Sequence, residues 1–235
     1  MKKPNSILFA LFALLTLSLS SPVSMDVLVW NGREMTSSNV KIFDVEAVPV
    51  ASSIQYPIQD CYDLQNERMM IYRCDENKIG EPWVSPSDWQ VKQVIYADLN
   101  RDGMEEFGLL VWRPFKSWPI DRFLPNPGRI ADFHDDQNLS CHFILIGWDG
   151  EKYRELWAGS ALADPISHLQ AADINQDGYD ELVAIEGKYE SSADGNLTIW
   201  KWQGFGFTLL DRIDGVFSNY TLYSSGKNVI LVPGS

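Results

Sequence analysis

The chain has 235 residues, of which 45% are hydrophobic, and it carries a formal net charge of −13 at pH 7. This surplus of acidic side chains argues against nucleic acids and other polyanions as partners, because phosphate recognition depends on basic side chains. The length suffices for one large all-β domain or two small ones.

Residues 1–24 have the pattern of a secretory signal peptide. Lys2 and Lys3 precede an apolar run over 7–17, and small residues then offer cleavage sites. The run is shorter than the roughly 20 apolar residues that span a bilayer, and no second long apolar stretch follows. We therefore expect a cleaved signal, no membrane span in the mature chain, and a secreted protein in an extracellular or periplasmic location. Cleavage would remove two lysines and no acid, which changes the net charge from −13 to −15.

The chain contains three cysteines, and an oxidising destination would favour pairing of two of them. Cys61 and Cys74 are near neighbours and could close a short hairpin, which would leave Cys141 free. Three unpaired cysteines that act as small hydrophobic side chains are the alternative. The sequence does not choose between these pairings.

Two segments, 71–112 and 143–186, follow the same order of predicted elements. Each has a short apolar strand, a polar turn, a tryptophan followed by serine, a further strand, an acidic loop and a final strand. A third copy runs over 197–232, but a plain polar turn at 224–228 replaces its acidic loop. The repeat therefore does not require that loop in order to join two strands.

Units of four short strands and about 45 residues predict an all-β fold, a small propeller of about four blades. We expect a single repeat domain over 25–235, with three recognisable units at about 68–113, 142–189 and 197–233. A degenerate unit at about 27–65 would supply the fourth blade. Alternatively, part of this N-terminal segment pairs with the C-terminal strand and closes the ring. An inserted loop over 114–141 is either a ligand surface or structural padding.

An eleven-residue acidic pattern precedes the final strand of both clear units. It reads DLNRDGMEEFG over 98–108 and DINQDGYDELV over 173–183. Oxygen side chains at positions one, three, five and nine, glycine at six and a backbone carbonyl at seven suit a hard cation with six to eight oxygen ligands. The alternative is a plain Asx-Gly turn, which would leave three carboxylates to repel one another without a counter-ion.

An EF-hand loop opens in the same way but requires a bidentate glutamate at position twelve. Those positions hold Leu109 and Ala184, and the flanking runs have the length and composition of strands. Glu106 and Glu181, at position nine, are therefore the natural closing ligands.

The spacing resembles the calcium loops of integrin-type FG-GAP and bacterial VCBS repeats, in which Asp-x-Asp/Asn-x-Asp-Gly-x-x-Asp precedes a strand. The resemblance covers roughly residues 68–190 and implies an integrin-alpha-like propeller with structural Ca²⁺ at about two sites. The chain differs from the family in having glutamate at position nine. The implied ligands are Asp98, Asn100, Asp102, the carbonyl of Met104 and Glu106 in the first loop, and Asp173, Asn175, Asp177, the carbonyl of Tyr179 and Glu181 in the second.

These features favour a secreted, non-catalytic, calcium-stabilised repeat module that presents a binding surface for protein or carbohydrate. The matching positions of Trp83, Trp157, Trp200 and Trp202 in the units favour packing between units over exposed sugar platforms.

The alternative function is an extracellular hydrolase or lyase with a site in the 113–142 loop. His134 and His142 lie there near Asp135 and Asp136, a set that could assemble an acid/base or zinc site. The Ser-Cys-His run at 140–142 matches no nucleophile motif. The sequence therefore favours a non-catalytic protein.

Overall fold

The computed structural model describes residues 24–41, 48–49, 60–74, 81–116, 132–225 and 228–234. The predicted signal peptide lies outside this part of the chain except for Ser24, and the centre of the predicted inserted loop, 117–131, lies outside it as well. The described residues form strands and turns without helix. They accordingly include no helix with the length and hydropathy of a membrane span.

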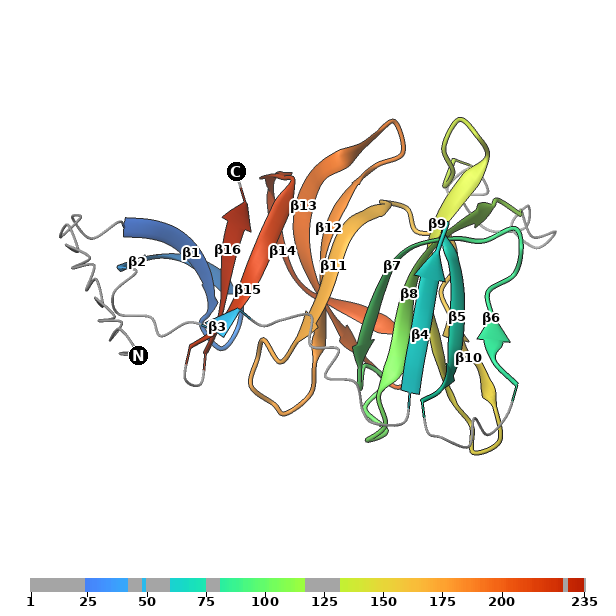
Figure 1. Ribbon diagram of the computed structural model, residues 1–235. Coiled ribbons are helices and arrows are strands. Elements are labelled where there is room, and N and C mark those ends of the chain that lie inside the picture. Colours follow the sequence, from blue (N-terminus) through green and yellow to red (C-terminus); the bar gives the residue numbers. More distant parts are fainter. Residues whose placement is uncertain are drawn as a thin grey trace, which may run out of the picture.

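The described strands form four antiparallel sheets, numbered here along the row that they make (Figure 1). Sheet 1 contains β4 (Asp60–Gln65), β5 (Arg68–Arg73) and β6 (Trp83–Val84). Sheet 2 contains β7 (Gln90–Ala97), β8 (Glu106–Pro114), β9 (Leu139–Trp148) and β10 (Tyr153–Ala158). Sheet 3 contains β11 (Ile166–Ala172), β12 (Glu181–Lys188), β13 (Ser191–Trp202) and β14 (Phe207–Phe217). Sheet 4, in spatial order, contains β2 (Met35–Lys41), β1 (Ser24–Trp30), β16 (Asn228–Gly234), β15 (Asn219–Ser225) and β3 (Val48–Pro49).

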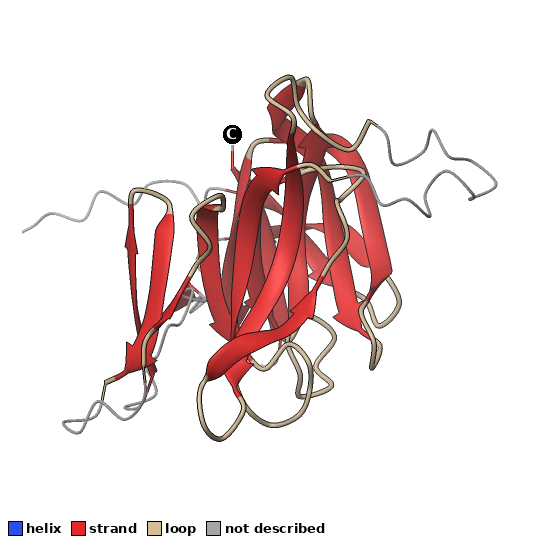
Figure 2. Ribbon diagram, turned by 90° about the vertical axis from the view of Figure 1, so that its right-hand side faces the viewer, coloured by secondary structure: helices blue, strands red, loops and turns tan. Residues whose placement is uncertain are grey.

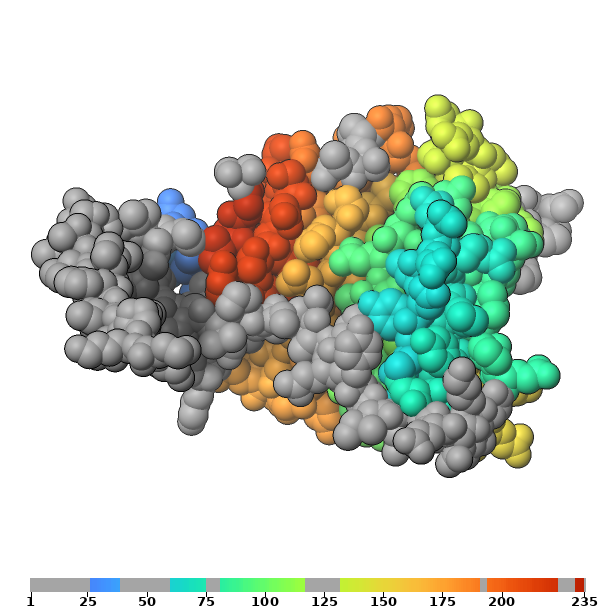
Figure 3. Space-filling view, viewed as in Figure 1, coloured from blue at the N-terminus to red at the C-terminus, as the bar shows by residue number. Residues whose placement is uncertain are grey.

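Three apolar clusters hold the four sheets together as successive layers. Figure 2 shows the strands of neighbouring sheets in layers with loops at their ends, and Figure 3 shows the same row from sheet 4 in red to sheet 1 in cyan. Successive side chains of one strand point to opposite faces of its sheet and so pack in two different cores. In β12, Leu182 faces sheet 2 while Val183 faces sheet 4. Representative core residues are Met69, Ile71, Phe107 and Ile146 between sheets 1 and 2, Leu110, Phe143 and Leu169 between sheets 2 and 3, and Ile185, Leu222 and Leu231 between sheets 3 and 4.

The apolar runs of β9 and β12 are continuous because both faces of their sheets are covered. The outer strand β14, by contrast, is exposed at many positions. The predicted all-β class is confirmed by this arrangement. Sheets 1 and 4 lie at opposite ends of the row in Figure 1, and no apolar cluster of the described residues joins them.

The sheets divide the chain at different points from the predicted units. The segment 68–113 contributes β5 and β6 to sheet 1 but β7 and β8 to sheet 2, and 142–189 is shared in the same way by sheets 2 and 3. A unit read along the sequence therefore supplies the last two strands of one sheet and the first two strands of the next.

The N-terminal strand pairs with the C-terminal strand of the described part. Leu28 lies opposite Leu231 and Val29 opposite Ile230 in the antiparallel pair of β1 and β16. The predicted pairing of part of the N-terminal segment with the C-terminal strand is therefore present among the described residues.

Cys61 on β4 and Cys74 just after β5 form a disulfide across two adjacent antiparallel strands, with Cα atoms 5.4 Å apart. Cys141 is the free cysteine and is buried on β9. The bridge links the ends of a hairpin in sheet 1, the sheet with the fewest strands.

Candidate metal centre

The two acidic loops occupy equivalent places in the fold. The first joins β7 to β8 in sheet 2, and the second joins β11 to β12 in sheet 3. Their backbones also agree, because φ is 65° at Arg101 and 63° at Gln176, and 86° at Gly103 and 89° at Gly178. Glycine at position six serves this left-handed conformation, which other residues adopt only at a cost.

The same backbone hydrogen bonds turn the aspartates of both loops inward. Asp98 accepts from the N–H groups of Asp102 (3.1 Å) and Gly103 (3.0 Å), while Asp102 accepts from the N–H of Met104 (2.9 Å). In the second loop Asp173 accepts at 3.0 and 2.9 Å, and Asp177 at 3.2 Å, from the equivalent groups. This is the local chemistry of Asx turns, so the loop shape itself does not depend on a bound ion.

Glu106 gives the first loop a buried carboxylate, which an Asx turn does not require. Its side chain is buried, at 1% exposure, and its Oε2 accepts weakly from the N–H groups of Leu99 (3.2 Å) and Asn100 (3.4 Å). Its Oε1 is buried with no hydrogen-bond partner. Burial raises the pKa of Glu106 to about 8, against opposition from the Asn100 N–H. An unpaired buried carboxylate oxygen is costly, and a cation at this point would remove that cost.

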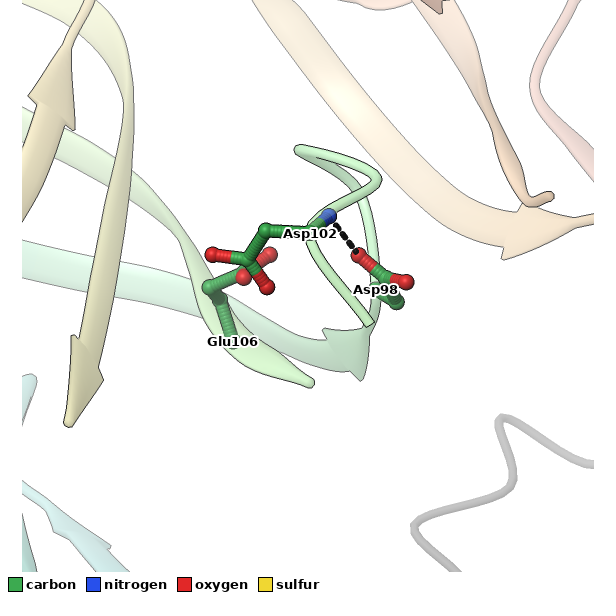
Figure 4. Close-up of side chains that lie close together, drawn as sticks. All are labelled: Asp98, Asp102 and Glu106. Carbon is green, nitrogen blue, oxygen red and sulfur yellow. Dashed lines mark hydrogen bonds between the residues drawn. The ribbon is translucent and has the colours of Figure 1, made fainter. Parts of the chain in front are cut away.

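Three carboxylates of the first loop converge. Asp98, Asp102 and Glu106 each offer an oxygen that lies within 4.8 Å of the other two, and Figure 4 shows the three side chains gathered within the loop. Oxygens bound to Ca²⁺ at 2.3–2.6 Å lie at such separations across the ion. The residues of the first loop therefore fit the cation that the sequence predicts.

Asn100 and Met104 are the other predicted ligands of the first loop. Asn100 Oδ1 already accepts from the Asp102 N–H at 2.9 Å, and its Nδ2 donates to Asp102 Oδ2 at 3.1 Å. Met104 would contribute its carbonyl oxygen and not its exposed side chain, because a hard cation takes oxygen ligands and not a thioether. Tyr179 is likewise exposed in the second loop.

The second loop is arranged differently around its buried glutamate. Glu181 Oε2 accepts from the N–H groups of Ile174 (3.1 Å) and Asn175 (3.3 Å), as in the first loop. Its Oε1, however, accepts from Asn175 Nδ2 at 2.7 Å and from Arg101 Nη2 at 2.9 Å. Burial raises the pKa of Glu181, and the guanidinium of Arg101 opposes that shift.

Asp177 is paired with two basic side chains. Its Oδ2 lies 3.3 Å from Arg101 Nη1 and 2.6 Å from Lys201 Nζ. Burial alone would raise the pKa of Asp177, but the hydrogen bond from Lys201 and the charges of Arg101 and Lys201 outweigh it and lower the pKa. Among the described residues, the close triad of acidic side chains occurs in the first loop and not in the second.

Sequence reasoning missed Arg101, Lys201, Glu105 and Asp180. Burial raises the pKa of Asp180, and the charges of Asp173, Asp98 and Glu105 add to the shift, so carboxylates of both loops act on one another. A signal for Arg101 was present, because a basic residue stands at position four of an acidic loop where the second copy has Gln176.

The structure separates the two histidines of the predicted alternative site. His134 lines a pocket with Asp132, Asp135 and Asp136, where its Nδ1 lies 2.7 Å from its neighbour's carbonyl oxygen. His142 lies on β9 and lines another pocket, of about 570 Å³. These residues do not form one zinc or acid/base site.

His142 is instead paired with Ser140 on the same face of β9. Its Nε2 lies 2.8 Å from Ser140 Oγ, and its Nδ1 lies 3.0 Å from the Gly159 carbonyl oxygen and 3.3 Å from Arg113 Nη2. Burial, reinforced by the charge of Arg113, lowers the pKa of His142 to about 4. A neutral imidazole that donates to Gly159 and accepts from Ser140 satisfies the two shorter contacts.

Aromatic side chains pack where sheets 2 and 3 meet at the β13–β14 hairpin. Trp157, Trp202 and Phe207 contact one another edge to face, with ring centroids 5.2–5.8 Å apart. Trp157 Nε1 also donates to the Phe205 carbonyl at 2.9 Å. The predicted packing role of Trp157 is therefore present in the structure.

Beside this cluster lies a groove of about 950 Å³. Trp157, Trp200, Phe205 and Phe207 line it, together with the buried Glu186, whose Oε1 accepts from Trp200 Nε1 at 2.9 Å. Phe205 is 88% exposed at its rim. Ligand sites are commonly concave, mostly apolar and furnished with a few polar groups, and this groove has that character.

No protein-family model matches the chain, and neither the curated proteins nor the solved structures include one with significant similarity.

Proposed function

We propose that this protein is a secreted, non-catalytic repeat module of the FG-GAP or VCBS type, in which Ca²⁺ at the first acidic loop stabilises the fold. The observation that carries the proposal is the buried Glu106, whose Oε1 has no hydrogen-bond partner and whose carboxylate offers an oxygen within 4.8 Å of oxygens of Asp98 and Asp102. A divalent cation supplies the charge that these three groups lack. Asp98, Asp102 and Glu106 would hold it, with Asn100 and the Met104 carbonyl as further oxygens.

The order of strands within sheets 2 and 3 supports a small propeller. Strands β7 to β10 and β11 to β14 follow one another in sequence within their sheets, as in propeller blades. Both acidic loops join the first two strands of a sheet, and β1 completes sheet 4 beside β16. The Cys61–Cys74 disulfide and the signal-like pattern of residues 1–24 support an extracellular or periplasmic location.

Thermal unfolding with and without calcium tests the proposed ion. The melting temperature of the mature protein should rise with millimolar Ca²⁺, in the range of extracellular calcium modules, and should fall with a chelator. Glu106→Gln should abolish the response, whereas Asp194→Asn, at an exposed acid outside the loops, should preserve it. Identical melting curves of the native protein under both conditions would refute a structural ion.

The aromatic groove is the proposed surface for a protein or carbohydrate ligand. Glycan-array and pull-down binding of the mature protein should require Phe205, which is 88% exposed in the groove, but not Val216, which is 83% exposed and does not line it. Phe205→Ala and Val216→Ala are thus a matched pair. Equal binding by the two variants would remove the groove from the proposal.

A second candidate function is hydrolysis at Ser140 and His142, supported by the 2.8 Å contact between Ser140 Oγ and His142 Nε2 in a pocket. Two observations rank it below the binding module. Ser140 is 1% exposed, and Arg113 beside His142 disfavours the imidazolium that base catalysis would form. A hydrolysis screen decides: turnover lost in Ser140→Ala and His142→Ala but kept in His134→Ala would establish the enzyme.

A further inference from the structure

The two loops share a sequence pattern, a backbone conformation and a place in their sheets. They differ in the basic side chains that contact their carboxylates. Among the described residues, no ion pair involves Asp98, Asp102 or Glu106 of the first loop. In the second loop, both Asp177 and Glu181 are engaged by basic side chains.

Arg101 comes from the first loop and reaches into the second. Its Nη1 and Nη2 contact Asp177 (3.3 Å) and Glu181 (2.9 Å), the residues at positions five and nine, where the resemblance places metal ligands. Its guanidinium carbon lies 4.8 Å from the ring centroid of Tyr179, at position seven. One planar cation thus pairs with two of the five predicted ligands and lies against the side chain of Tyr179, whose carbonyl is a third.

Burial makes this pairing durable. The side chains of Arg101 and Glu181 are 17% and 0% exposed. A guanidinium keeps its charge at physiological pH and matches carboxylates through fixed donor geometry. A divalent ion could reach the same oxygens only by displacing it, because two cations at this spacing would repel. Lys201 adds a second positive charge on Asp177.

We propose that Arg101 takes the place of the second calcium ion, so that the protein binds one structural Ca²⁺, in the first loop, and closes the second loop with its own guanidinium. The number of ions in the native protein rests on the proposed function, whereas the role of Arg101 in the second loop does not. The equivalent residue of the second loop is the neutral Gln176, so the exchange runs in one direction only.

Calcium stoichiometry, measured by calorimetry and by metal analysis after dialysis, tests the proposal. The native protein should bind one ion per chain, and Glu106→Gln none. Arg101→Gln should bind two, because the oxygens of Asp177 and Glu181 become free for metal. The double variant Arg101→Gln/Glu106→Gln should bind one, in the second loop.

Arg101→Lys is the matched control, because it retains a positive charge and should still exclude the second ion. If Lys201 alone still excludes the ion from the second loop of Arg101→Gln, the double variant Arg101→Gln/Lys201→Gln removes both basic side chains and should bind two ions. In chelator, Arg101→Gln should melt below the native protein, and Ca²⁺ should remove this difference in melting temperature.

The outcomes separate the two proposals. Two ions on the native protein, or no additional ion in both Arg101→Gln and Arg101→Gln/Lys201→Gln when these variants are folded, would overturn the role of Arg101. No ion on the native protein with one on Arg101→Gln would support that role while refuting the metal in the first loop.

Discussion

Gln93 and Leu169 exchange hydrogen bonds between sheets 2 and 3. The side-chain Nε2 of Gln93 donates to the Leu169 carbonyl at 2.6 Å, and the Leu169 N–H donates to Gln93 Oε1 at 3.1 Å. The side-chain amide of Gln93 on β7 thereby pairs with the backbone of β11 through two hydrogen bonds. The N–H and carbonyl groups of Leu169 are part-buried, so they depend on Gln93 for their hydrogen bonds.

Replacing Gln93 should weaken the joint between these sheets. We expect Gln93→Ala to cost about 1–3 kcal/mol in urea unfolding, because it leaves a donor and an acceptor of Leu169 unpaired. Lys92→Ala is the control, since it removes an exposed ion pair with Glu67 and should cost less than about 1 kcal/mol. Equal losses in the two variants would contradict the role given to Gln93.

Glu186 should make the protein less stable as pH rises. It is 7% exposed, and burial raises its pKa from 4.5 to about 7. A raised carboxyl pKa gives stability that is complete below the unfolded value and is lost as pH rises through the folded value. Between pH 4.5 and 7 the unfolded state has released this proton while the folded state holds it, so about 3 kcal/mol is lost over that window.

The variant Glu186→Gln should match the native protein near pH 4 and exceed its stability by about 3 kcal/mol near pH 8. Glutamine can still accept the hydrogen bond from Trp200. Urea unfolding across pH, with the exposed Glu151→Gln as reference, measures the difference. A parallel pH dependence in native protein and Glu186→Gln would exclude this residue as the cause.

The two acidic loops should respond unequally to loss of their first aspartate. Asp98→Ala should abolish the rise of melting temperature with calcium, because Asp98 is one of the three convergent carboxylates. Asp173→Ala should lower stability but keep the calcium response, because Arg101 serves the second loop. Calorimetric melting of both variants with Ca²⁺ or chelator distinguishes them, and a response lost equally in both would favour two bound ions.

Cys141 should be inert in the native protein. It is completely buried, and burial raises the pKa of its thiol to about 12, so almost no reactive thiolate exists at neutral pH. A thiol reagent should label no cysteine in the native state, one after unfolding without reductant, and three after unfolding and reduction. Rapid native labelling at Cys141 would show that sheets 2 and 3 open at β9.

Local features of the fold could be predicted from the sequence. Continuous apolar runs such as 143–146 and 182–185 predict buried strands, and Asx-Gly chemistry predicts the inward aspartates of both loops. These properties depend on residues close together in the chain. The acidic triad of the first loop is local in the same sense, because its members lie within nine residues.

Non-local relationships could not be predicted. Sheet membership depends on which strands pair, so periodicity located β5 to β8 but did not show that they divide between two sheets. Arg101 crosses from one loop to a different sheet, and spacing along the chain carries no record of that contact. His134 and His142, close in sequence, line different pockets because β9 carries one of them into the core.

The pairing of β1 with β16 has a consequence for biogenesis. A ribosome produces Leu28 long before its partner Leu231. Sheets 1, 2 and 3 can therefore assemble from contiguous chain before the hairpin of β1 and β2 has β16 to pair with. During that interval β1 presents an unsatisfied edge, which is a site for chaperone capture or for mispairing with another molecule. Truncation before residue 228 would leave this edge permanently open.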